Sequence, residues 1–163
     1  MVRFKYISSA IFISVLLQTT LMEYISIGGA KPLLLLAVAI CALLSFGVTT
    51  GVVTGIVCGL IMDITAGRGV GLSALLLMYI CLACGLICHK TFQEKSSVVM
   101  LFTFVASILY ELLYTFFLFF AWGKGTPLII LGRIVPEAIL TAVFAVPLFL
   151  IFKRVKSAEW MND

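Results

Sequence analysis

The chain has 163 residues, of which 63% are hydrophobic and only 11% are charged, and its formal net charge is +4. With a mean hydropathy of +1.26, it has too few polar side chains to cover a soluble domain, and the small, dispersed charge argues against nucleic-acid binding. Apolar stretches of the ~20 residues that a helical span needs fill nearly the whole chain. We therefore predict an all-α polytopic membrane protein of about six transmembrane helices, forming one integral membrane domain over residues 1–163.

The first predicted span covers residues 6–25. Arg3 and Lys5 precede it, as basic residues precede the apolar part of a signal peptide. No clear small-residue cleavage site follows the apolar run, so we interpret it as an uncleaved first span.

The second and third spans, residues 32–46 and 47–63, are predicted from one stretch without a charge that runs from Pro32 to Met62. Pro32 suits the first turn of a helix, where its missing N–H costs nothing. As one helix the stretch would be ~46 Å long, well beyond a hydrocarbon core of ~30 Å. We therefore divide it near Gly47, with one long, strongly tilted helix as the alternative.

Glycines recur every fourth residue along the third span, at Gly47, Gly51, Gly55 and Gly59. A spacing of four drifts only slowly around a helix, so these glycines form one narrow stripe. Small residues let another helix approach closely, and such packing drives helix association in lipid. The stripe therefore predicts a helix-packing surface.

The same spacing continues past the stripe with a carboxylate and two more glycines, at Asp63, Gly67 and Gly71. We expect Asp63 to lie where the third span ends, before the loop to the next span. A carboxylate there can accept hydrogen bonds from free N–H groups at the start of the fourth helix.

The remaining spans are predicted at residues 71–88, 98–120 and 128–152. Six spans place both termini on one side, together with seven basic residues: Arg3, Lys5, Lys90, Lys95, Lys153, Arg154 and Lys156. The other side carries four: Lys31, Arg68, Lys124 and Arg133. Because cytoplasmic loops carry an excess of Lys and Arg, both termini are predicted to be cytoplasmic.

Three ionisable residues stand out in the last two spans. Glu111 is predicted near the middle of the fifth span, and Arg133 and Glu137 lie four apart at the entry of the sixth, where they can pair. Ionisable groups at mid-span cost ~2.5–3.5 kcal/mol on insertion scales, so they are functional candidates. A proton or cation pathway needs several such groups at mid-depth, so we favour a structural or partner-contact role for Glu111.

Cys81, Cys84 and Cys88 precede His89, and their spacing places the sulfur atoms on one helix face. A zinc site is the alternative to apolar packing here, but the motif lies inside an apolar span without a second Cys/His pair. We predict no metal and no cofactor. The chain also has no Ser/His/Asp set and no phosphate-binding loop, so we predict that it is not an enzyme.

The pattern G-x-x-x-G-L-x-x-D-x-x-x-G-x-x-x-G-L, from Gly55 to Leu72, resembles the rod shape-determining MreD family. The segment Lys31-Pro32-Leu33 and the segment from Val135 to Ala142, followed by Pro147, are also similar to it. The resemblance implies a non-enzymatic component of the bacterial cell-elongation machinery in the cytoplasmic (inner) membrane. Its implied partners are MreC and, indirectly, MreB and the cell-wall glycosyltransferase–transpeptidase pair, so that it helps to control cell shape and lateral peptidoglycan synthesis.

The MreD family is similar in fold to the substrate-binding subunits of energy-coupling-factor vitamin transporters, and such a subunit is the alternative function. The short, plain outer loops predicted here favour the scaffold over a vitamin binder. Besides its protein partners the chain would contact the lipid bilayer and no nucleic acid, and a homo-oligomer is kept open.

Overall fold

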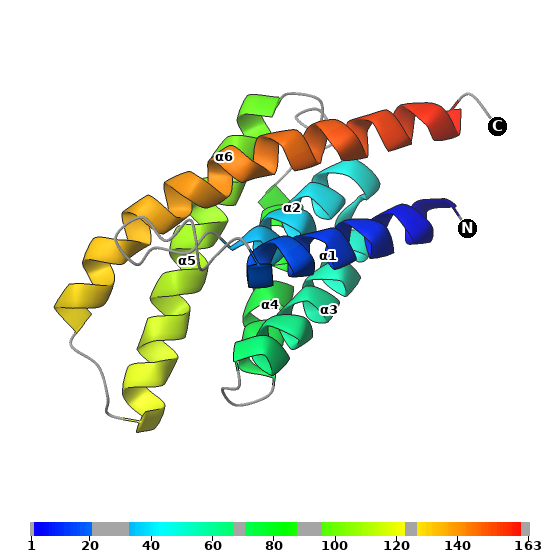
Figure 1. Ribbon diagram of the computed structural model, residues 1–163. Coiled ribbons are helices and arrows are strands. Elements are labelled where there is room, and N and C mark those ends of the chain that lie inside the picture. The colour runs from blue at the N-terminus through cyan, green and yellow to red at the C-terminus, as the bar shows by residue number, and fades with distance from the viewer. Residues whose placement is uncertain (1, 21–32, 67–70, 88–95, 123–126, 161–163) are drawn as a thin grey trace.

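The computed structural model describes residues 2–20, 33–66, 71–87, 96–122 and 127–160, and these residues form six helices (Figure 1). The helices are α1 (Val2–Thr20), α2 (Leu34–Phe46), α3 (Val48–Ala66), α4 (Leu72–Ile87), α5 (Ser96–Trp122) and α6 (Pro127–Trp160). The predicted all-helical fold class is confirmed over this part of the chain.

The long uncharged stretch forms two helices, α2 and α3, which meet at Gly47. Gly47 has a φ of 100°, a left-handed backbone conformation that residues with a side chain rarely adopt. Its N–H donates to the carbonyl oxygen of Leu43 at 3.0 Å, which closes the last turn of α2. The chain therefore reverses at one glycine, and the alternative of a single tilted helix is wrong.

The core of the fold is α2. Every residue from Leu34 to Ser45 is buried, and all five other helices contact α2. Its sequence is apolar all round rather than on one face, which is the pattern of a helix enclosed on every side. A helix of 13 residues is ~20 Å long, shorter than a hydrocarbon core.

Three contacts along α6 show that α2 and α6 run parallel. Leu33 N–H donates to Thr141 Oγ1 at 3.0 Å, and the thiol of Cys41 lies 3.5 Å from the carbonyl oxygen of Ala145. Near the ends of both helices, the rings of Phe46 and Phe152 pack edge to face with centroids 5.9 Å apart. Residue numbers thus rise together along the two helices.

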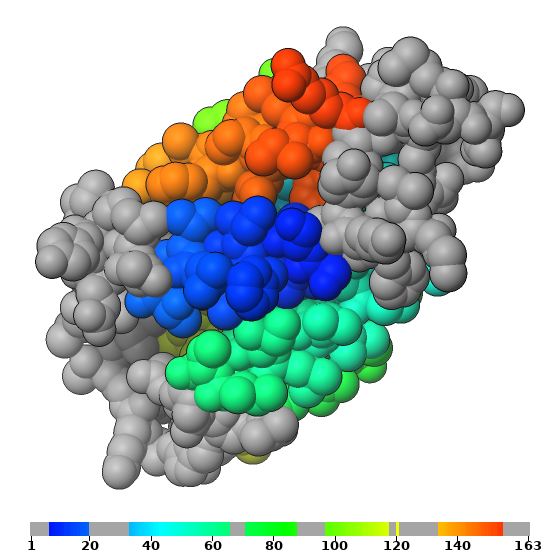
Figure 2. Space-filling model, turned by 45° about the vertical axis from the view of Figure 1, so that its right-hand side comes forward, coloured from blue at the N-terminus to red at the C-terminus, as the bar shows by residue number. Residues whose placement is uncertain are grey.

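Consecutive helices run in alternating directions. The start of α2 meets the end of α1, where Leu35 N–H donates to Gln18 Oε1 at 3.4 Å. The start of α4 meets the end of α3, as described below, and the N- and C-terminal helix ends lie at the same end of the molecule (Figure 1). The space-filling view shows α1 lying across one face, between α6 and α3 (Figure 2).

Three helices in the described part are long and apolar enough to cross a membrane, over Val48–Thr65, Ser97–Phe117 and Ile134–Arg154. The apolar segments of the other three helices, Ile7–Thr19, Leu34–Phe46 and Leu72–Ile87, are shorter in the part described. α6 has 34 residues and is ~51 Å long, which exceeds a hydrocarbon core of ~30 Å. It continues as a helix through Pro136 and Pro147, which membrane helices tolerate because neighbouring groups satisfy the freed backbone.

Candidate functional site

Asp63, in the last turn of α3, caps the start of α4. Its Oδ2 accepts a hydrogen bond from Gly71 N–H at 2.7 Å, and both carboxylate oxygens accept from Ser73 N–H, at 3.2 and 3.1 Å. The first N–H groups of a helix have no partner inside it, and a negative charge there is favourable. Asp63 is only 3% exposed, so the buried carboxylate and the helix start satisfy each other. This is the arrangement that the sequence predicts for Asp63.

Gly71 provides the turn that brings α4 under this carboxylate. It has a φ of 110°, and its carbonyl oxygen accepts the first hydrogen bond of α4, from Leu75 N–H at 3.0 Å. A residue with a side chain is strained in this conformation even though the surrounding space is open. Gly67, which the sequence places in the same motif, lies outside the described residues.

Ser73 links this cap to α5. Tyr110 donates its hydroxyl hydrogen to Ser73 Oγ at 3.0 Å, and both side chains are 3% exposed. The ring of Tyr110 stacks on Tyr114 with a centroid distance of 5.7 Å and an interplanar angle of 16°. Asp63, Ser73 and Tyr110 therefore form one buried hydrogen-bonded chain across three helices, which we call the capping triad.

Next along α5, Glu111 reaches α6 rather than the triad. The side chains of Glu111 and Glu137 lie close to each other, and both are partly buried. Glu111 lies in the middle part of α5, and Glu137 lies ten residues after the start of α6 at Pro127.

The side chain of Arg133, predicted to pair with Glu137, lies outside the described part of the structure. Thr141, one turn beyond Glu137, accepts from Leu33 N–H and donates to the Glu137 carbonyl oxygen at 2.7 Å. On α6, Glu137 thus lies beside Glu111 of α5, and Thr141 binds the start of α2.

The glycine stripe of α3 faces the inside of the bundle. A methyl group added at Gly51 would lie 2.6 Å from the Cα of Leu43 on α2, and one added at Gly59 would lie 2.6 Å from the backbone nitrogen of Ala74 on α4. At Gly55 it would lie 3.1 Å from the sulfur of Cys81. Separations under 3 Å leave no room for a side chain, so at Gly51 and Gly59 the backbone of α3 touches its neighbours directly. Gly47, at the turn, has open space around it instead.

Four cysteines within the described residues, Cys41, Cys58, Cys81 and Cys84, are reduced and buried. No group of three metal-ligating side chains occurs among the residues that the structure describes. Cys88 and His89 lie outside them. Cys81 instead contributes a small apolar surface opposite Gly55, which is a common use of buried cysteine.

Comparison with known families decides what kind of protein carries this arrangement. The family model for the rod shape-determining protein MreD matches residues 1–155. The chain belongs to the MreD family. No curated protein and no solved structure matches it.

Membership of the MreD family implies a role in rod-shape determination. MreD is a family of shape-determining structural proteins and is not a known enzyme family. Together with the three long apolar helices, it identifies this chain as a membrane protein.

Sequence reasoning missed several residues of this MreD-family site. It did not single out Ser73 or Tyr110, because an isolated Ser or Tyr in an apolar helix gives no pattern. Gly85, which faces Val48 across α3 and α4, was also missed. A signal for it existed, since Ala74, Cys81 and Gly85 are small residues at spacings of seven and four, which share a helix face.

Proposed function

We propose that this chain is a six-span, non-enzymatic scaffold of the bacterial cell-elongation machinery that binds MreC in the cytoplasmic membrane. The observation that carries the proposal is the match of the MreD family model to residues 1–155. Through MreC the scaffold would reach MreB and the glycosyltransferase–transpeptidase pair, and so help to control lateral peptidoglycan synthesis.

The geometry supports a scaffold because the motif residues serve the fold itself. The hydrogen bonds of the capping triad join α3, α4 and α5. Gly51 and Gly59 let the backbone of α3 contact α2 and α4 directly. A partner is therefore expected on the outer faces. Those faces carry exposed apolar side chains on several helices: Phe12, Val57, Tyr79, Val105 and Val143.

The orientation proposed has both termini in the cytoplasm. Two features support it: the alternating helix directions, and the seven basic residues of the sequence on the terminal side against four on the other. In this orientation the capping triad and the Glu111–Glu137 pair lie toward the outer face of the membrane.

Site-specific crosslinking to MreC tests the scaffold. Single cysteines are placed in a cysteine-free chain at exposed positions on different helices: Phe12, Val57, Val105 and Val143. The matched control is a cysteine at Ala39, which is fully buried in α2. We expect MreC crosslinks from one or two neighbouring helices and none from position 39.

A folded chain that gives no MreC crosslink from any exposed helix, and that does not retain MreC during purification from membranes, would contradict the proposal. Native mass spectrometry of the purified chain addresses the vitamin-transporter alternative, because a bound vitamin-like ligand at one copy per chain would favour that function.

A further inference from the structure

A tyrosine lies on the outer face of α4, halfway along the helix. Tyr79 is the eighth of the 16 residues of α4, and its side chain is 61% exposed. The other faces of α4 contact α2, α3 and α5. The ring of Tyr79 therefore points away from the bundle, toward whatever surrounds it.

Contacts near both ends of α4 show that Tyr79 is far from either end of the bundle. At the start of the helix, Ser73 N–H donates to Asp63 at the end of α3. Near the other end, Gly85 faces the side chain of Val48 at the start of α3. Tyr79 is six residues from Ser73 and six from Gly85, which is ~9 Å along the helix in each direction.

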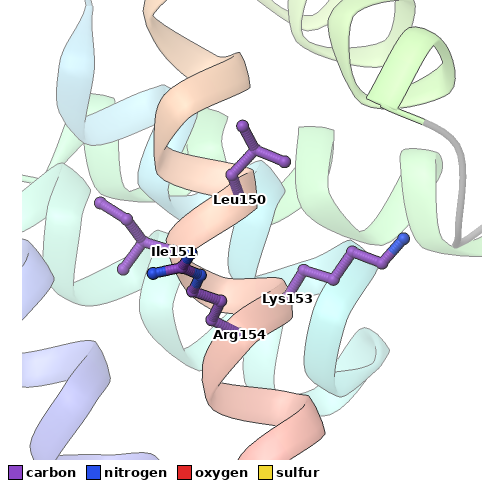
Figure 3. Close-up of a pocket in the computed structure, with 4 residues that line it drawn as sticks. All are labelled: Leu150, Ile151, Lys153 and Arg154. Carbon is purple, nitrogen blue, oxygen red and sulfur yellow. The ribbon is translucent and has the colours of Figure 1, made fainter.

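Basic residues of α6 mark the membrane level at which α3 starts. Phe46, which directly precedes the turn into α3, packs against Phe152. Lys153 and Arg154 follow Phe152 and extend to opposite sides of α6 (Figure 3). Long basic side chains at the end of an apolar span reach the headgroup level. In the six-span arrangement proposed above, Tyr79 therefore lies deep in the hydrocarbon core.

The hydroxyl of Tyr79 has no hydrogen-bond partner among the residues that the structure describes. A threonine on a helix can donate to its own backbone, as Thr54 does to the carbonyl oxygen of Thr50 at 2.7 Å. A tyrosine hydroxyl lies beyond its ring, away from the helix that carries it, and tyrosines are enriched at membrane interfaces, where water is in reach. Because a polar group without a partner is costly in lipid, Tyr79 requires an acceptor from outside the chain.

Tyr79 belongs to an exposed row of residues that we call the α4 stripe, in which spacings of four and three alternate; its other members are Leu75, Leu82 and Leu86. This is the spacing of the contact face in a pair of parallel helices. A row with the same spacing runs along α3 but is aliphatic throughout: Val53, Val57, Leu60 and Ile64. Lipid tails satisfy the α3 row, whereas they cannot bind the hydroxyl group of the α4 stripe.

We propose that the α4 stripe packs against the α4 stripe of a second copy of this chain, with the two Tyr79 hydroxyls hydrogen-bonded to each other. Copies inserted in the same direction are related by a two-fold axis along the membrane normal, so the two α4 helices are parallel and equal residues meet at one depth. A tyrosine hydroxyl both donates and accepts, so each copy brings the partner that the other lacks. A helix of a different protein would need a polar group at this one level. The inference rests on the six-span arrangement and not on MreC binding.

Cysteine crosslinking in liposomes tests the contact on the full chain, without MreC and with its own cysteines replaced. Leu82→Cys lies on the α4 stripe, and Leu60→Cys on the α3 row is the matched control, since both positions are similarly exposed. Oxidation with iodine at rising ratios of lipid to protein separates specific pairs from chance collisions. We expect disulfide-linked dimers from position 82 that persist on dilution, and from position 60 only a background that falls with dilution.

Energy transfer between chains labelled at the C-terminal tail measures association over the same dilution series. Tyr79→Phe removes only the hydroxyl and should weaken association about 3- to 30-fold, the range for one hydrogen bond between membrane helices. Thr65→Val removes an exposed hydroxyl away from the α4 stripe and should associate like the wild type. Tyr79→Phe should leave the unfolding of the single chain unchanged, which separates weaker association from misfolding.

Three results would overturn the proposal. No dimers from position 82, or equal crosslinking from positions 60 and 82, would show random encounters alone. Wild-type association of Tyr79→Phe would show that the two hydroxyls do not meet. A crosslink from position 82 to added MreC, in place of the second copy, would assign the α4 stripe to that partner. The first two results are obtained without MreC, so they do not bear on the scaffold proposal.

Discussion

At the scale of single residues, Asp63 caps a helix to which it does not belong. A capping side chain usually comes from the residue just before the helix, whereas this one reaches α4 from the end of α3. The carboxylate therefore fixes the position of one helix against the next as well as closing its first turn. The Asp63 carboxylate is buried. If it is removed, water does not take its place as the hydrogen-bond acceptor for the N–H groups of Gly71 and Ser73.

We expect Asp63→Leu to destabilise the chain far more than Asp63→Asn. Leu leaves the Gly71 and Ser73 N–H groups without an acceptor, at about 1–3 kcal/mol each. Asn keeps an acceptor oxygen and loses only the charge, at about 0.3–2 kcal/mol. Thermal unfolding in detergent with a thiol-reactive dye measures both, because the four described cysteines are buried until the fold opens.

Thr65→Val is the matched control for Asp63, since Thr65 lies two residues away and its exposed hydroxyl bonds only to its own helix. We expect it to unfold near the wild-type temperature. If Asp63→Asn were as damaging as Asp63→Leu, the charge itself would be essential, and an ion or proton site would explain Asp63 better than a cap.

Tyr110→Phe tests the outer member of the capping triad. The change removes one hydroxyl and keeps the ring that stacks on Tyr114. We expect a loss of about 0.5–1.5 kcal/mol in unfolding free energy, the net worth of one hydrogen bond. Tyr79→Phe is the control, because Tyr79 is 61% exposed on the outside of α4. An equal effect of the two changes would mean that the hydroxyl of Tyr110 contributes nothing specific.

At the scale of helices, the contact between α3 and α4 depends on the absence of a side chain at Gly59. We expect Gly59→Ala to destabilise the bundle by about 1–3 kcal/mol, because even one methyl group must push the Ala74 backbone away. Gly55→Ala should cost less, since a methyl group there would lie 3.1 Å from the Cys81 sulfur and 3.3 Å from the Leu77 carbonyl oxygen, both farther away than the Ala74 backbone is from Gly59. Dye-monitored unfolding in detergent shows which of the two variants is less stable.

Val57→Leu adds a methylene to the same helix at a position that is 41% exposed, and should leave stability unchanged. If Gly59→Ala also unfolded like the wild type, the stripe would not be a close-packing surface. That result would remove the packing role that both the spacing of the glycines and the geometry of α3 support.

The start of α2 is held by a hydrogen bond from Leu33 N–H to the hydroxyl oxygen of Thr141. Thr141→Val keeps the shape of the side chain but removes the acceptor for Leu33 N–H, and we expect a loss of about 1 kcal/mol. Thr141→Ser keeps the hydroxyl and should be closer to the wild type in the same unfolding assay. If Ser were no better than Val, the packing of the methyl group would matter rather than the hydrogen bond.

Local patterns of the sequence predicted the helices and the role of Asp63 well. Charge-free runs and glycines mark helices and turns directly, and the length of the uncharged stretch favours a break near Gly47 over one tilted helix. The pairing of Glu111 with Glu137, and the link from Tyr110 to Ser73, could not be predicted, because they depend on how distant helices rotate and slide against each other. The spacing within one helix contains no information on that register.

At the scale of the whole molecule, the alternating helix directions predict on which side of the membrane each connection and each terminus lies. Cysteines introduced at Ser96 and in the C-terminal tail, in a cysteine-free chain, should resist a membrane-impermeant thiol reagent added to intact spheroplasts and react after lysis. A cysteine at Lys124, between α5 and α6, should react in intact spheroplasts. Labelling of position 96 and the tail from outside would reverse the proposed orientation.

The enclosure of α2 has a consequence for how the protein is made. Only α1 precedes α2 in the chain, so α2 leaves the ribosome before four of the five helices that contact it. Its apolar surface is compatible with lipid until the other helices are made. Thr141 and Phe152, which contact the start and the end of α2, lie on α6 and are synthesised after the other four helices. A nascent chain stopped after Trp122 should therefore insert and yet remain open to membrane proteases. Pulse-chase labelling with limited proteolysis should show resistance only once α6 has been translated.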